Sequence, residues 1–139
     1  MNNYDLIQII NTLSRYENTK FPQKISYAIT KNLMALQKEY AVYNSQLNKL
    51  FQKYDDDAIH QDGEVVKDIN GAPIIKDEAT RMQFHTELAD LLNIEVEDTS
   101  LYTIDPETFN YDDSSGKYDA MTPTDIAVLQ TILCATESK

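Results

Sequence analysis

The chain has little of several residue types on which small folds often depend. Its 139 residues include one cysteine, three glycines and no tryptophan. A single cysteine, Cys134, excludes an intramolecular disulfide and a zinc site built from several thiolates. The scarcity of glycine argues against a β-sandwich, which needs many turns, and against a glycine-rich phosphate-binding loop. No apolar run approaches the roughly 20 residues of a membrane span, and no basic-then-apolar leader opens the chain. We therefore expect a soluble, intracellular protein that makes no contact with a membrane.

Charge is divided unevenly along the chain. Residues 1–54 contain seven lysines and arginines against three acidic residues, whereas residues 55–139 contain five against twenty. The net side-chain charge is therefore +4 in the first region and −15 in the second, and −11 overall. Such an asymmetry reports on partners more than on fold, because like charges on a small body steer what approaches it. We expect one domain, residues 1–139, with a basic and an acidic region.

The basic region predicts two helices that form a helical hairpin. The longer one, over residues 22–54, contains no glycine and has proline only at its first turn. The mainly apolar positions along one face of this helix, which we call the seam, recur about every 3.6 residues, which is the period of a straight α-helix. They are Ile25, Ile29, Asn32, Leu36, Tyr40, Tyr43, Leu47, Leu50 and Tyr54. Asn32 is polar, and it either fixes the helix register from a buried position or lies at the rim.

The acidic region predicts shorter elements. Asn70-Gly71 favours a type I′ turn and hence a β-hairpin over residues 64–76. Two further extended segments, residues 94–96 and 101–104, are expected to pair with each other or with the hairpin.

Capping residues in the acidic region mark two more helices. Asp77 is a good N-cap for a helix over residues 78–92. Thr122 to Asp125 form a capping box with proline at the first turn, which predicts a helix over residues 123–136. The predicted fold is thus mainly α, with a long central helix packed against two to three shorter helices and a small β-hairpin, or minor antiparallel sheet, inserted mid-chain.

No known catalytic signature is present. None of the three glycines places acidic residues at EF-hand spacing, although a looser divalent-metal site at Asp55–Asp57 with His60 and Asp62 stays open. His85 and Glu87 match the start of a zinc-deaminase motif, but the required pair of cysteines is absent. We expect a protein that is not an enzyme and that has no metal or cofactor, with Cys134 as a buried apolar residue.

The face of the long helix opposite the seam is basic. Lys24, Tyr27, Lys31 and Lys38 lie nearly opposite Ile25 at 100° per residue, with Lys49 on the same side and Met34 at its edge. Such a face is either merely solvated or a ligand- or partner-binding surface, on which lysines meet phosphates or carboxylates and Tyr27 stacks on a base or fills a pocket. The acidic region similarly either keeps the chain in solution, or competes for basic grooves on another protein, or docks on the basic face of a second copy.

One segment carries a family resemblance. The run Lys20-Phe21-Pro22-Gln23-Lys24-Ile25-Ser26-Tyr27-Ala28-Ile29-Thr30-Lys31-Asn32 resembles the opening of small, mostly uncharacterised proteins of bacteriophages and prophages. The tyrosine-rich helix, the Asn-Gly turn, the segment 91–96 and the Thr-Pro-capped helix follow in the same order, so that the similarity spans about residues 20–133. The resemblance implies a phage accessory protein that acts in the host cytoplasm, and it brings no catalytic residues.

These observations lead to one expected function and one alternative. We expect a non-enzymatic phage protein that antagonises host antiviral defence, either by blocking a host defence protein or by sequestering a nucleotide immune signal. The alternative is a structural or replication-associated phage protein that uses the long helix as an assembly surface. A homodimer or higher oligomer fits both, and a net charge of −11 argues against direct binding of duplex nucleic acid.

Overall fold

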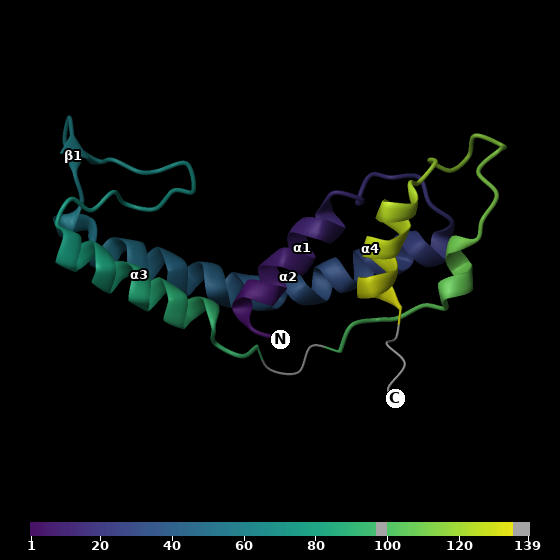
Figure 1. The fold of residues 1–139 in the computed structure, drawn as a ribbon, viewed down its shortest axis with the longest axis horizontal. Coiled ribbons are helices and arrows are strands. Elements are labelled where there is room, and N and C mark those ends of the chain that lie inside the picture. Colours follow the sequence, from purple (N-terminus) through teal and green to yellow (C-terminus); the bar gives the residue numbers. More distant parts are fainter. Residues whose placement is uncertain (97–99, 135–139) are drawn as a thin grey trace. The chain divides into compact units, whose positions relative to one another are not determined.

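The fold of the described residues is mainly helical. The computed structural model describes residues 1–96 and 100–134. Its helices in this part are α1 (Asn3–Ser14), α2 (Gln23–Lys53), α3 (Glu78–Leu92) and α4 (Pro123–Leu133), with 3-10 turns η1 (Asp55–Asp57) and η2 (Pro106–Phe109) (Figure 1). Strands β1 (His60–Gln61) and β2 (Glu64–Val65) form a two-stranded antiparallel sheet. The predicted fold class, with a long helix, shorter helices and a small sheet mid-chain, is confirmed.

The helix bounds follow local sequence signals closely. The observed α2 is one residue shorter at each end than the predicted helix 22–54, and α3 matches the predicted 78–92. The fourth helix begins at Pro123 as expected but ends at Leu133, because Cys134 already has extended backbone angles as its C-cap. The predicted residues 135–136 lie outside the described part. No helix among the described residues is long and apolar enough to cross a membrane.

Side-chain caps explain two of these starts. The Asp77 carboxylate accepts a hydrogen bond from the Thr80 amide at 2.9 Å, which satisfies one free amide at the start of α3. At α4 the Thr122 hydroxyl accepts from the Asp125 amide at 3.1 Å, and the Asp125 carboxylate accepts in return from the Thr122 amide and hydroxyl. This is the predicted capping box, with Pro123 at the first turn.

The regular hairpin differs in position from the predicted one. The two strands pair His60 with Val65 across a turn at Asp62 and Gly63, both of which have positive φ. The Asn70-Gly71 turn is also present. Backbone hydrogen bonds join its two arms, from the Asp68 amide to the Ala72 carbonyl at 2.9 Å and from the Ile74 amide to the Val66 carbonyl at 3.0 Å, with a bridge between Lys67 and Pro73. The predicted pairing is therefore present over residues 66–74, but not as regular strands, because Pro73 has no amide hydrogen to donate.

The two other extended segments do not pair with each other or with the hairpin. The amide of Val96 donates to the carbonyl of Met1 at 2.9 Å, and the amide of Asn3 donates to the carbonyl of Ile94 at 3.0 Å. The amide of Ile104 donates to the carbonyl of Leu133 at 2.8 Å. The predicted strand pairing was therefore wrong, since each segment satisfies its backbone against an element distant in sequence.

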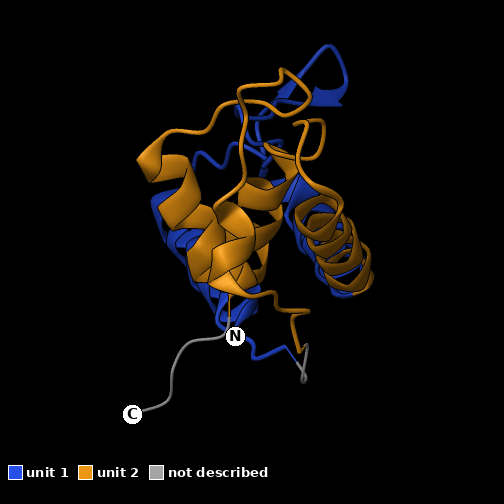
Figure 2. Ribbon diagram, turned by 90° about the vertical axis from the view of Figure 1, so that its right-hand side faces the viewer, with its two compact units in different colours: residues 1–4, 39–96 blue, residues 5–38, 97–139 orange. Residues whose placement is uncertain are grey.

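The chain divides into two compact units, each described here by itself (Figure 2). Unit 1 comprises Met1–Tyr4 and Glu39–Val96, and unit 2 comprises Asp5–Lys38 and Glu97–Lys139. The boundary falls inside α2 rather than at the change of charge after residue 54. Each unit thus contains part of the basic region and part of the acidic region, while the single domain of residues 1–139 stays a prediction.

Unit 1 has an aromatic core where the end of α2 meets α3. Leu50, Tyr54, Ile75 and Phe84 are buried together, with Phe51, Ala72 and Leu88 packed against them. The rings of Tyr54 and Phe84 meet edge-to-face at 5.2 Å between centroids, which is a favourable aromatic geometry. Ile75 anchors the loop before α3 in this core.

Unit 2 is built around the first half of α2. Its fully buried side chains come from α1, α2 and α4; they are Leu6, Leu13, Ile25, Ile29, Asn32, Leu36, Leu129 and Leu133. The phenol of Tyr16, just after α1, donates to the carboxylate of Asp125 in α4 at 2.7 Å. This seam of α2 matches the predicted one, and it fixes which face of the helix remains open to solvent.

Candidate functional site

The predicted binding residues lie on the open face of α2 in unit 2. Lys24, Tyr27, Lys31 and Lys38 are all exposed, and Tyr27 retains 55% of its accessible surface. An exposed tyrosine of this kind is available for contact with a ligand or partner. Met34, at the edge of the same face, is 65% exposed. The expected exposure of this face is therefore present.

Lys31 lies between two aromatic rings. Its ammonium nitrogen is 5.6 Å from the ring centroid of Tyr27 and 4.9 Å from that of Tyr102. The two rings are themselves in edge-to-face contact, with centroids 5.4 Å apart. Both distances to the ammonium are within the range of cation–π attraction. We call these three residues the Lys31 platform.

Tyr102 was not predicted as a site residue, and Asn32 explains its position. The Asn32 side-chain amide donates to the Tyr102 carbonyl at 2.9 Å, and its oxygen accepts from the Tyr102 amide at 2.7 Å. Asn32 is only 1% exposed. It therefore acts as a buried anchor, one of the two roles considered from the sequence, and it fixes the backbone of Tyr102 next to the helix. No local sequence pattern connects residues seventy positions apart.

The other predicted residues are not drawn into the platform. Lys24 and Lys38 make no ring contact, and within residues 1–96 and 100–134 neither they nor Lys31 form an ion pair with a carboxylate. Their ammonium groups remain available to an incoming anion. The structure thus brings together Tyr27 and Lys31, and leaves Lys24 and Lys38 as separate charges on the same face.

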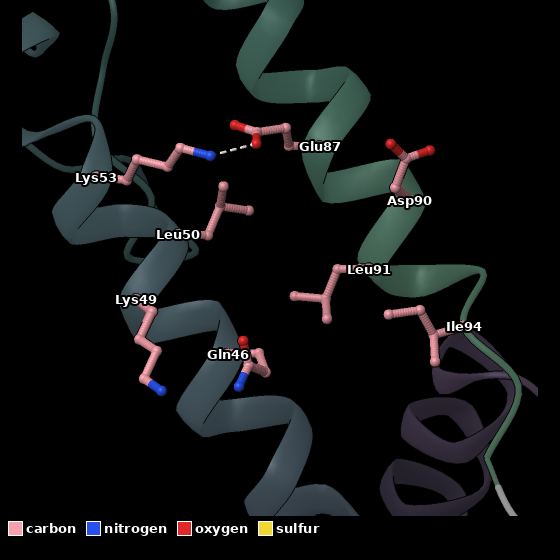
Figure 3. A pocket seen from close by; sticks show the side chains of 8 residues that line it. All are labelled: Gln46, Lys49, Leu50, Lys53, Glu87, Asp90, Leu91 and Ile94. Carbon is pink, nitrogen blue, oxygen red and sulfur yellow. Dashed lines mark hydrogen bonds and ion pairs between the residues drawn. The ribbon is translucent and has the colours of Figure 1, made fainter.

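A cavity of about 400 Å³ lies between α2 and α3 in unit 1 (Figure 3). Leu50 and Leu91 point toward each other across it, while Lys49 and Asp90 extend away from each other. At one end the Lys53 ammonium and the Glu87 carboxylate form an ion pair at 2.5 Å. One lysine and one carboxylate of the lining are therefore paired, while Lys49 and Asp90 form no ion pair among the described residues.

Glu87 also accepts a hydrogen bond from the phenol of Tyr54. That hydrogen bond, assisted by burial and the carboxylate charge, raises the pKa of Tyr54 to about 12. In return, the hydrogen bonds from Lys53 and then Tyr54 hold the pKa of Glu87 below its usual value. The phenol of Tyr54 therefore stays neutral and the carboxylate of Glu87 stays charged at neutral pH, so that this network ties α2 to α3 and neither of these two groups is poised for proton transfer near pH 7.

The acidic segment after α2 was the only sequence-based candidate for a divalent metal. Asp55–Asp57 form the 3-10 turn η1, and the His60 ring bonds to the Ala58 carbonyl at 2.9 Å. Among the described residues, which include all of this segment, no three His, Cys, Asp or Glu side chains are grouped so that they could hold a metal ion. The looser site considered from the sequence is thus not formed in the structure.

The last two residues considered from the sequence are His85 and Cys134. His85 is exposed and its ring contacts that of Phe84 edge-on, at 5.7 Å between centroids. Cys134 is buried, as expected, and burial raises the pKa of its thiol above the ordinary value. A raised thiol pKa lowers the thiolate fraction and hence the nucleophilicity at neutral pH.

Comparison with known proteins adds no assignment. No family model matches the chain, and no curated protein or solved structure matches it either.

Proposed function

We propose that the protein is a non-enzymatic binding protein of bacteriophage origin that antagonises host antiviral defence. It either sequesters a nucleotide immune signal on the open face of α2 in unit 2, or blocks a basic host defence protein with its acidic surface. In the first version the contact residues are Lys24, Tyr27, Lys31 and Lys38. The phage context rests on the resemblance of residues 20–133 to small phage and prophage proteins.

The single observation that supports this proposal is the Lys31 platform. An ordinary surface lysine is mobile and loses side-chain entropy when it is fixed against a ligand. Here two rings already confine the ammonium of Lys31, by interactions worth about 0.5–1 kcal/mol each at exposed sites. A confined ammonium beside an exposed tyrosine suits a ligand that combines negative charge with a flat apolar group, as a nucleotide does.

The overall charge of −11 limits how such a ligand is recognised. Long-range repulsion acts on any anion, but it is screened beyond about 8 Å at physiological ionic strength. Short-range contacts with Lys31 and its neighbours then decide the binding. The acidic surface supports the other version of the proposal, in which a basic host protein is blocked.

Titration with adenosine triphosphate, followed by heteronuclear NMR on the whole chain, tests the surface. We expect shifts confined to residues around Tyr27, Lys31 and Tyr102, and about fivefold weaker binding for Lys31→Gln, because a charge-assisted contact is lost. Lys49→Gln is the matched control, since it removes the same charge from the same helix within unit 1. Equal effects of the two substitutions, or no binding at all, would contradict a nucleotide-binding surface.

A plaque assay tests the biological role. Phage with and without the gene are plated on hosts that each carry one antiviral defence system. We expect the gene to restore plaques on at least one host, and Lys31→Gln to reduce that rescue while Lys49→Gln retains it. Absence of rescue on every host would argue against antagonism of defence.

The exposed Met34 favours the alternative function, a structural or replication-associated phage protein with α2 as an assembly surface. An apolar side chain that retains 65% of its surface, about two helical turns from Tyr27, can be covered by a second copy or another phage protein. Under this alternative Met34→Glu disrupts an oligomer, whereas Lys31→Gln has little effect on it. Light scattering after size-exclusion chromatography distinguishes the two.

A further inference from the structure

A second cavity in unit 1, of about 480 Å³, is lined by α2, α3 and the loop that precedes α3. Its volume is within the range of small-molecule sites, which are typically apolar with a few polar groups at defined places. Apolar and aromatic side chains make up most of its wall, and they are Tyr43, Leu47, Phe51, Ala72, Pro73, Ile74, Ile75, Phe84, Leu88 and Leu92. Such a lining favours a ligand with an extended apolar body.

The side of this cavity that carries nitrogen donors comes from one face of α3. Arg81 and His85 are four residues apart, so they lie one above the other on the helix, and both are exposed. Among residues 1–96 and 100–134, Arg81 forms no direct ion pair. The Asp77 carboxylate, one turn before it, interacts with it electrostatically but is held by hydrogen bonds from Thr80. Its guanidinium therefore retains the paired N–H donors that recognise a carboxylate.

Asp68 is the single carboxylate in the cavity wall, and it is committed to the loop. Its Oδ1 accepts from the amide of Asn70 at 2.8 Å and from the amide of Ala72 at 3.0 Å. These bonds hold the turn that closes the cavity opposite α3. The acidic group therefore shapes the wall, while the donors of Arg81 and His85 are left for a ligand.

The cavity of Figure 3 provides a contrast on the other side of the same helix pair. There Lys53 and Glu87 form an ion pair, while Lys49 and Asp90 also line the cavity. The cavity beside Arg81 instead combines an apolar wall with an arginine that has no direct ion pair in the described part of the chain.

We propose that this cavity binds an amphipathic carboxylate, that is, a small organic acid with an aliphatic or aromatic body. The carboxylate binds Arg81, with His85 as a further donor, and the apolar body lies against Leu47, Phe51 and Leu88. This site is separate from the Lys31 platform and does not depend on the function proposed for unit 2.

Titration of the whole chain with decanoate, below its micellar concentration, tests the ligand class. We expect saturable binding, with NMR shifts at residues 68–75 and along α3. Octanoate, which is two methylenes shorter, is expected to bind roughly tenfold more weakly. Decan-1-ol is also expected to bind at least tenfold more weakly. Equal or tighter binding of decylammonium, or shifts that lie outside unit 1, would overturn the proposal.

The two arginines of the chain provide a matched pair of variants. Arg81→Gln is expected to weaken decanoate about tenfold and to leave decan-1-ol unchanged, because only the charge-assisted contact is lost. Arg15→Gln removes the same charge in unit 2 and is expected to leave decanoate binding unchanged. Since Arg81 is exposed, its replacement leaves the core of unit 1 intact, and a melting curve verifies this. Equal decanoate affinity in both variants would disprove the role of Arg81.

Discussion

At the scale of single residues, Asn32 shows how one polar side chain can organise a helical core. Its amide donates to and accepts from the backbone of Tyr102, as a neighbouring β-strand would. The buried position is tolerated because both ends of the amide are satisfied. The same pair of hydrogen bonds holds the ring of Tyr102 near the ammonium of Lys31, the residue before Asn32 in the helix.

Replacing this amide tests its contribution to stability. Asn32→Leu leaves the amide and carbonyl of Tyr102 without their partner, so we expect a loss of about 2 kcal/mol in the free energy of unfolding, measured with urea. Asn48→Leu, at an exposed position of the same helix, is expected to change it by less than about 0.5 kcal/mol. Equal stabilities of the two variants would show that water replaces the lost bonds.

Tyr54 predicts a pH dependence at the alkaline end. Its pKa is about 12 in the folded chain and 10.0 in its ordinary state, so its bond to Glu87 stabilises the fold fully below pH 10. That contribution is lost as the pH rises from about 10 to about 12, because the unfolded chain releases the proton first. Tyr54→Phe lacks the bond at every pH. The stability difference between the two proteins should therefore shrink over this interval, and urea unfolding at several pH values measures it; a difference that stays constant would contradict the assignment.

At the scale of elements, local capping determines where α4 begins. Thr122→Ala removes the hydroxyl that accepts from the Asp125 amide, and we expect a loss of about 1 kcal/mol in the free energy of unfolding. Thr124→Ala, two residues along and exposed, is expected to have an effect of less than about 0.5 kcal/mol. Thermal unfolding followed by circular dichroism compares the two, and a larger loss in Thr124→Ala would contradict the capping role.

The helices could be predicted from the sequence, whereas the strands could not. Helix period and caps depend on residues within four positions of each other, as at Asp77 and Thr122, so the pattern is complete in a short window. Pairing of extended segments depends on distant partners: Val96 bonds to Met1, and Ile104 to Leu133. The regular strand pair flanks Asp62-Gly63, whereas the pairing around Asn70-Gly71 is irregular because Pro73 has no amide hydrogen to donate.

The candidate site was also predictable only where it depends on residues close together in the sequence. The periodicity of α2 indicated that the face with Lys24, Tyr27, Lys31 and Lys38 is exposed to solvent, because the apolar seam lies on the opposite face. The contribution of Tyr102 was not predictable, because it depends on the hydrogen bonds of Asn32 to a segment far along the chain. Arg81 carried no distinguishing pattern, and its significance comes from the cavity beside it.

At the scale of the whole molecule, charge and compact units divide the chain differently. The basic region ends and the acidic region begins after residue 54, while unit 1 and unit 2 each contain part of both regions.

A charge-paired homodimer is the prediction that belongs to this scale. In solution at about 0.1 M salt it should form if the acidic region docks on Lys24, Lys31 and Lys38 of a second copy, and it should dissociate at about 1 M salt. Light scattering measures the mass, and a mass that is independent of salt, or unchanged in Lys38→Glu, would exclude such pairing.

The burial of Cys134 has a practical consequence for studying all of these surfaces. The chain contains no other thiol, and this one is buried and has a raised pKa. Maleimide dyes should therefore label the native protein slowly, while Met34→Cys should be labelled rapidly at the new position. A change in the emission of a fluorophore attached there would report the binding of a ligand or partner beside Lys31, in a cell extract or in a purified mixture.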